Sequence, residues 1–180
     1  AAEKAAKRGL KIISDNIYQI DHKTAQAEVV TAFDMIEHTT NPLDFVSTLC
    51  RLSKEKGYVI ISSGNTEALS WRINRNKYYY CASPEHITFI NKKWCHFASE
   101  MLNLKMIEYH EYSHSKSSGV MRGIEDLAKN LSYLLLPRIF IGLRKMRVKK
   151  IEELDENAPY DHPPYWYSSK NHFIVLFQKK

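Results

Sequence analysis

Apolar residues occur along this chain as short runs separated by amphipathic stretches. Continuous apolar runs lie at residues 10–14 (LKIIS), 28–33 (EVVTAF), 58–62 (YVIIS) and 171–178 (NHFIVLFQ). Residues 104–112 (LKMIEYHEY) instead alternate apolar with polar positions. Runs of this length predict β-strands, and a continuously apolar run such as 58–62 predicts a strand buried on both faces. We therefore expect five strands.

Helical patterns fill the stretches between these runs. Residues 1–7 are alanine and charged residues that favour helix, and Gly9 follows as a stop signal. Asn41-Pro42 predicts a helix start, and apolar residues then recur at three- and four-residue spacings up to residue 52. A further helix is predicted at 91–102. A strand, a helix and a strand in quick succession predict a parallel pair with a right-handed crossover, which is typical of an α/β fold.

Composition narrows the class of protein. The chain has 180 residues, of which 44% are hydrophobic and 26% charged, as expected of one globular domain. Three cysteines without a C-x-x-C pair predict a reducing, cytoplasmic setting. The formal net charge of +6 favours anionic partners without choosing between nucleic acid and lipid. Because aromatic and basic residues are not interleaved, we expect no nucleic-acid partner.

Several motifs, taken in order, resemble one family. Residues 29–42 (VVTAFDMIEHTTNP) resemble the segment around strand 4 of class I S-adenosylmethionine-dependent methyltransferases. Residues 60–65 (IISSGN), 84–87 (PEHI) and the last apolar run resemble the end of strand 5, a segment preceding a helix, and the final antiparallel strand. No single motif is decisive, but their order and spacing are specific as a set. The similarity is greatest to ubiquinone-biosynthesis-like O-methyltransferases and related small-molecule methyltransferases.

The resemblance implies a Rossmann-like α/β sheet with part of it missing. Strands 3 to 7 would be residues 10–14, 29–33, 58–62, 104–112 and 173–177, with a helical insertion at 115–168 inside a partial domain spanning 1–180. Strands 1 and 2 have no counterpart, and no G-x-G loop occurs anywhere in the sequence. We therefore expect a fragment of a longer enzyme that is inactive by itself. Strand 4 would have an unpaired edge, and the first 25 or so residues would be loosely held.

The resemblance also implies where S-adenosylmethionine binds. Asp15 and Asn16 would meet the adenine, while Ala32, Phe33 and Asp34 would line the cofactor pocket at the carboxyl end of strand 4. Two alternatives arise from the residues themselves. Asp15 is equally well explained as a turn residue, and Phe33 as part of the core.

Glu37 and His38 occupy the place where the family positions groups facing the transferred methyl. We predict that they are catalytic, with His38 as a general base for a substrate hydroxyl. The alternative is structural: the pair would hold the loop and cap the following helix. In some relatives an acid-x-x-Glu-His cluster binds a divalent cation, and Asp34, Glu37 and His38 reproduce that spacing. One such cluster is weak support, so we expect no metal here.

The acceptor side is predicted from aromatic residues and one histidine. His86, Trp71 and Trp166 would face a small-molecule acceptor, with the alternatives that His86 holds a loop and that Trp166 only anchors the chain before the last strand. O-methylation is the expected reaction. An RNA-modifying enzyme and a non-catalytic interaction domain are the competing hypotheses.

A basic, apolar stretch at 120–150, interrupted by Pro137, allows two interpretations. It would either lie on an anionic membrane, which suits a lipid-linked acceptor and a peripheral location, or form a cap packed on the domain.

Overall fold

The computed structural model describes residues 2–23, 26–113, 119–139, 142 and 169–180. Its helices and strands are α1 (Ala2–Lys7), β1 (Ala27–Phe33), α2 (Pro42–Leu52), β2 (Ser53–Gly64), α3 (Leu69–Asn74), α4 (Lys92–Met101), β3 (Leu104–Tyr112), α5 (Gly119–Leu135) and β4 (His172–Lys179). Short 3-10 helices lie at η1 (Ile17–Gln19), η2 (Ile36–His38), η3 (Arg75–Lys77) and η4 (Tyr79–Ala82).

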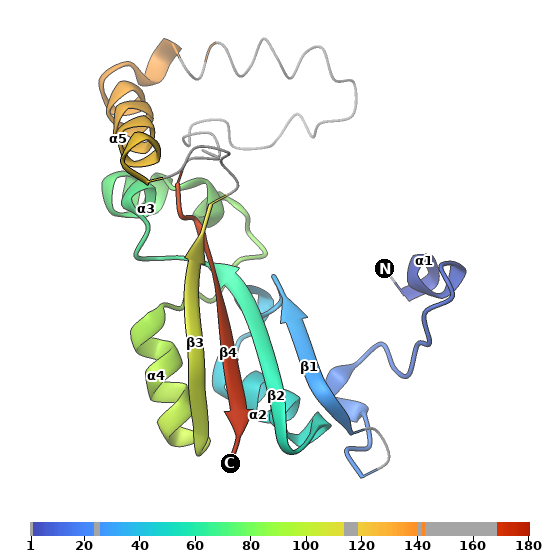
Figure 1. The fold of residues 1–180 in the computed structure, drawn as a ribbon. Coiled ribbons are helices and arrows are strands. Elements are labelled where there is room, and N and C mark those ends of the chain that lie inside the picture. The colour runs from blue at the N-terminus through green and yellow to red at the C-terminus, as the bar shows by residue number, and fades with distance from the viewer. Residues whose placement is uncertain (1, 24–25, 114–118, 140–141, 143–168) are drawn as a thin grey trace.

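The four strands form one mixed sheet in the order β1-β2-β4-β3 (Figure 1). β1 pairs with β2 in parallel, and β4 is antiparallel to both of its neighbours, β2 and β3. The parallel pair connected through α2 and the antiparallel last strand are both as predicted. The chain therefore has the mixed α/β sheet that the pattern of apolar runs indicated.

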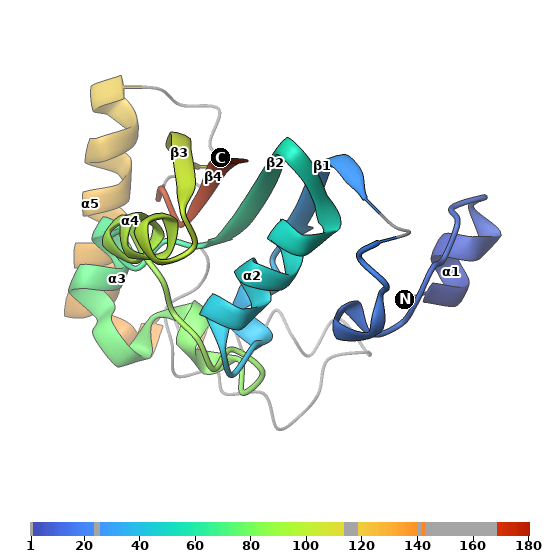
Figure 2. The same ribbon diagram turned by 90° about the horizontal axis from the view of Figure 1, so that it is seen from below.

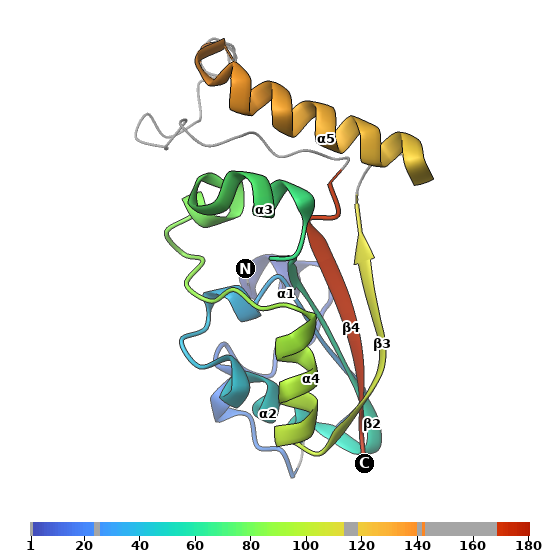
Figure 3. The same cartoon turned by 90° about the vertical axis from the view of Figure 1, so that its left-hand side faces the viewer.

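Helices α2 and α4 cover the same face of the sheet (Figures 2 and 3). The core lies between them and the sheet, where Val59 and Ile61 of β2 meet Val46 and Leu49 of α2. Helix α2 starts where predicted, because the Asn41 side chain accepts a hydrogen bond from the Asp44 N–H at 3.2 Å and Pro42 follows it. Burial of this face is what fixes the strand register.

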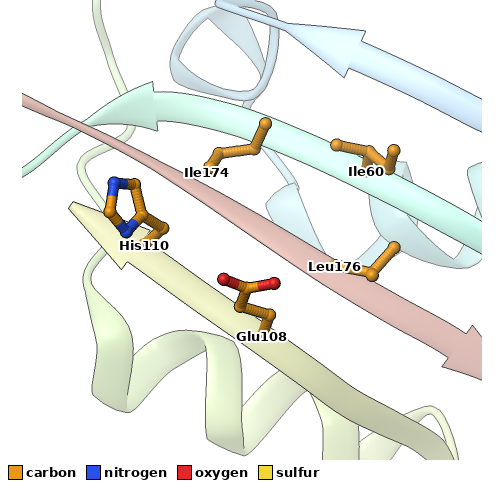
Figure 4. Close-up of a pocket in the computed structure, with 5 residues that line it drawn as sticks. All are labelled: Ile60, Glu108, His110, Ile174 and Leu176. Atoms are coloured by element: carbon orange, nitrogen blue, oxygen red, sulfur yellow. The ribbon is translucent and has the colours of Figure 1, made fainter. Parts of the chain in front are cut away.

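The opposite face of the sheet is not covered by any helix in the described part of the chain. Val29 and Phe33 of β1 are 48% and 53% exposed there. A shallow pocket of about 290 Å³ runs across β2, β4 and β3 on this face, between Ile60, Leu176 and Glu108 (Figure 4). Parallel strands are normally buried on both faces, so the exposure of this face departs from the usual pattern. β1 is also the edge strand, as expected.

The predicted strand at residues 10–14 is wrong. These residues form no strand, and Leu10 and Ile13 are largely exposed. The segment lies beyond β1, away from the rest of the sheet (Figure 1). An apolar run becomes a strand only if a neighbour pairs its N–H and C=O groups, and β1 does not pair with it.

Helices α3 and α5 lie at the end of the sheet where β1, β2 and β3 terminate (Figures 1 and 3). α5 buries polar residues toward the protein: Asn130 accepts a hydrogen bond from the Asn74 side chain at 2.8 Å, and its own amide donates to Asp126. Burial raises the pKa of Asp126 above its ordinary value. α5 ends two residues before Pro137. Most of the predicted 115–168 insertion lies outside the described residues.

Candidate active site

The site is built on the turn that follows β1. Asp34 leaves the strand with φ of 50°, and its N–H donates to the Ser62 carbonyl at 3.1 Å. This sharp turn leads directly into η2, where Ile36 is fully buried and anchors the turn against the core. η2 therefore holds Glu37 and His38 at the carboxyl ends of β1 and β2, the edge at which open α/β sheets bind ligands.

The Glu37 side chain points inward and is only 1% exposed. Its Oε2 accepts a hydrogen bond from the Ser63 hydroxyl at 2.8 Å, and its Oε1 accepts one from the Tyr80 hydroxyl. The Tyr80 oxygen in turn accepts from the Gly64 N–H at 3.1 Å. Burial, together with the Glu37 carboxylate, raises the pKa of Tyr80. Tyr80 therefore stays a hydrogen-bond donor, and both carboxylate oxygens of Glu37 have a partner.

The Glu37 main chain also holds a second loop. Its carbonyl oxygen accepts hydrogen bonds from the N–H groups of Ile87 at 2.9 Å and Thr88 at 3.0 Å. This pair of bonds brings residues 85–88 against the turn after β1, although about 50 residues separate them in sequence. His86 is thereby placed beside His38.

Each of the two histidines has one ring nitrogen fixed by a backbone carbonyl. His38 Nδ1 lies 3.0 Å from the Glu85 oxygen, and His86 Nδ1 lies 2.7 Å from the Tyr80 oxygen. A carbonyl can only accept, so the neutral rings carry their proton on Nδ1 and leave Nε2 with a lone pair. The ring centroids are 5.0 Å apart. His38 is exposed and His86 half-buried, so His38 is the more accessible base.

Aromatic side chains line the inner side of this group. The Tyr80 ring packs on the His86 ring, with ring centroids 4.1 Å apart. The centroid of the Trp71 ring lies 4.8 Å from that of Tyr78 and 5.1 Å from that of Phe89. Trp71 is half-buried and is linked to the histidines through Tyr80. The structure thus brings together Trp71, His86, Glu37 and His38, four of the residues that the sequence singled out.

The residues expected to hold the cofactor are more dispersed. Phe33 and Asp34 are exposed at the carboxyl end of β1, so the alternative that Phe33 packs in the core is wrong. The Ala32 side chain is buried in the core and offers only its backbone to a ligand. Asp15 and Asn16 are exposed in the segment beyond β1, where the Asn16 side chain accepts from the Tyr18 N–H and caps η1.

A scan against family models matches residues 2–108 to a methyltransferase domain. This chain belongs to that methyltransferase family. Solved structures agree on the fold. A SAM-dependent methyltransferase from Archaeoglobus fulgidus is similar with a TM-score of 0.51 and 13% identity, covering 99% of this chain and 80% of its own. A putative methyltransferase from Bacillus halodurans has a TM-score of 0.55 and 14% identity, covering 99% and 77%.

Coclaurine N-methyltransferase, solved with N-methylheliamine and SAH, has a TM-score of 0.50 and 14% identity, covering 99% of this chain and 56% of its own. No curated protein matches the chain. The predicted resemblance to methyltransferases is therefore confirmed at the level of family and fold. The similar proteins specify neither the acceptor nor the individual site residues of this methyltransferase.

Potential metal ligands in the methyltransferase site differ from the predicted set. Ligand atoms of Glu37, His38 and His86 lie within 4.8 Å of one another, whereas Asp34 is not part of this group. The Asp34 carboxylate instead accepts from the Ser62 hydroxyl at 3.4 Å. Each Glu37 oxygen accepts one hydrogen bond, so a cation would share that oxygen with Ser63 or Tyr80. The expectation of no metal stays a prediction.

Two residues of the site, Tyr80 and Ser63, were not predicted from the sequence. Tyr80 and Ser63 hold Glu37, yet Tyr80 is one tyrosine among several in residues 78–80 and lies 43 residues from Glu37. No local pattern marks such a partnership. Trp166, predicted to line the acceptor site, lies outside the described residues.

Gly64 provides a test of how tightly this site is packed. A Cβ at position 64 would lie 2.5 Å from the Tyr80 ring, so we expect Gly64→Ala to displace Tyr80 and to destabilise the protein by about 2 kcal/mol. Urea unfolding measures this. Gly123→Ala in α5 is the control, because its added Cβ would have no heavy atom within 4 Å and should be neutral or slightly stabilising. Equal stability of Gly64→Ala and the wild type would mean that the Tyr80 contact is loose.

Proposed function

We propose that this methyltransferase transfers the methyl group of S-adenosylmethionine to a hydroxyl of a small molecule. The observation that carries the proposal is the exposed His38 ring at the carboxyl end of the parallel strands, whose Nδ1 is fixed on the Glu85 carbonyl. A hydroxyl nucleophile needs a base, and a neutral imidazole with one free lone pair supplies it.

The carboxyl end of β1 suits the cofactor. Phe33 presents an exposed aromatic face and Asp34 an exposed carboxylate next to the free edge of the sheet. We propose that these two residues hold the adenosine part of S-adenosylmethionine. Asp15 and Asn16 would contribute only if their segment closed over the adenosine. The intact enzyme would supply a glycine-rich loop at the β1 edge. The names of the similar proteins support this choice: one is SAM-dependent and another was solved with SAH. The bound sulfonium would supply an activated methyl group.

The residues of this chain then have three tasks. His38 Nε2 accepts the proton of the acceptor hydroxyl as the oxygen becomes nucleophilic. The imidazolium so formed keeps its hydrogen bond to Glu85 and lies within 4.8 Å of a ligand atom of Glu37, whose negative charge stabilises it. Trp71 and His86 form the wall that orients a flat acceptor and excludes water. Trp166 is proposed for the same wall.

Methyl transfer from labelled S-adenosylmethionine tests the proposal directly. The full-length protein is incubated with a panel of phenols, catechols and matched amines in the presence of EDTA, because no metal is required by the proposed mechanism. We expect saturable transfer to hydroxyl acceptors, with mass spectrometry placing the methyl on oxygen. Transfer to amines alone would contradict O-methylation, and failure to bind S-adenosylmethionine in calorimetry would contradict the activity itself.

A further inference from the structure

A hollow of about 430 Å³ lies between two parts of the chain. One part is the end of α3 together with η3, and the other is the C-terminal end of α5. None of the residues that line the hollow belongs to the site around His38. Three cations line it: Arg75 and Lys77 of η3 and Arg138, which follows α5. The lining contains no acidic residue, and no ion pair joins any of these three cations to another residue of the described chain. Arg75 is also held at φ of 51°, a conformation that non-glycine residues seldom adopt without a reason.

An apolar surface adjoins this basic hollow. The side of α5 that faces the protein buries Asp126, Asn130 and Tyr133. The outward side is apolar, which is the reverse of an ordinary amphipathic helix. The exposed residues include Val120, at 81%, and Leu135, at 75%. The outward apolar side chains are Val120, Met121, Ile124, Leu127, Leu131, Leu134 and Leu135. Leu134 belongs both to this surface and to the lining of the hollow, so the two features are continuous.

We propose that the hollow binds the phosphate headgroup of an anionic phospholipid while the outward face of α5 enters the membrane interface. Arginine and lysine are the side chains that bind phosphate, and apolar side chains beside them match the acyl boundary just below a headgroup. No helix in the described part of the chain is both long and apolar enough to cross a bilayer. The contact therefore lies in the plane of the membrane surface.

Charge separates this occupant from a second copy of the chain. Arg75, Lys77 and Arg138 lie together in the hollow with no acidic residue in its lining. Pairing two copies through the apolar face of α5 would leave these cations without an anionic partner, whereas an anionic bilayer attracts each basic residue near its surface by about 1 kcal/mol. A nucleic acid would match the charge but not the apolar face.

Vesicle co-sedimentation of the full-length protein tests this proposal without reference to methyl transfer. The vesicles are phosphatidylcholine alone, or an equal mixture of phosphatidylcholine and phosphatidylglycerol. We expect binding to the mixture only. Arg75→Glu with Lys77→Glu should weaken it roughly tenfold or more, as should Ile124→Gln with Leu134→Gln.

The matched control is Lys93→Glu with Lys105→Glu. It changes the net charge equally, at exposed positions on α4 and β3 that do not line the hollow. This control should retain binding. Equal loss in both charge-reversed variants would reduce the effect to net charge and overturn the proposal.

Two further outcomes would also overturn it. One is phosphate-dependent protection of Arg75 from chemical modification without any vesicle binding, which would identify a soluble phosphate ligand. The other is a wild-type dimer that Ile124→Gln with Leu134→Gln dissociates, which would identify a second copy on α5.

Discussion

Replacing His38 with alanine should lower kcat of the intact enzyme about a hundredfold while leaving the Kd for S-adenosylmethionine within twofold. The reason is that the ring is proposed to act on the acceptor proton, whereas the adenosine side of the cofactor is proposed to lie on Phe33 and Asp34. Single-turnover methyl transfer and calorimetric cofactor binding measure the two quantities separately. The loss should shrink at high pH, where an acceptor hydroxyl ionises without help.

His110→Ala is the control for that experiment. His110 is an exposed histidine on β3 that lines the pocket on the uncovered sheet face, away from the Glu37 turn. Its removal should leave kcat unchanged. Unchanged kcat in His38→Ala would eliminate His38 as the base, and a parallel rise in the cofactor Kd would place it in the cofactor pocket instead.

Glu37→Ala should destabilise the protein by about 3 kcal/mol. The substitution leaves the buried Tyr80 and Ser63 hydroxyls without their acceptor and opens a cavity under η2. Urea denaturation of the full-length protein gives the free energy of unfolding. Glu37→Gln keeps one acceptor oxygen and should lose clearly less.

Glu85→Ala is the matched control, because the Glu85 side chain is exposed and only its carbonyl oxygen is used, by His38. It should change stability by less than about 0.5 kcal/mol. A double-mutant cycle with Tyr80→Phe then isolates the bond between Glu37 and Tyr80. Strict additivity of the two substitutions would show that this bond does not couple them.

Local signals in the sequence predicted the elements that depend on local chemistry. Helix α2 starts at Asn41-Pro42 because a capping side chain and a preformed φ act within a few residues. β2 and β4 were visible as continuous apolar runs in the middle of the sheet. The prediction that 58–62 is buried on both faces is wrong, because Tyr58 is 38% exposed and Ile60 only half-buried on the uncovered face. The position of Glu37 and His38 after β1 followed from the same pattern, since the end of a strand predicts a turn at the carboxyl edge.

Features that depend on distant partners were not predictable in this way. Residues 10–14 have the composition of a strand, but composition does not show whether a neighbouring strand exists to pair with them. Tyr80 binds Glu37 although 43 residues separate them in sequence. The two meet only because the fold places both beside the end of β2, where Gly64 donates to the Tyr80 oxygen. The outward apolar face of α5 was hidden because periodicity shows that a helix has two faces and not which one faces the protein.

The double hydrogen bond at the Glu37 carbonyl ties the position of the base to that of residues 85–88. Any outward swing of residues 85–88 breaks the bonds from Ile87 and Thr88 and also pulls on the Glu85 oxygen that fixes His38. Opening of that loop would therefore release the His38 ring from its fixed position. We therefore expect the exposed His38 ring to receive its acceptor while residues 85–88 stay in place and the base keeps its position.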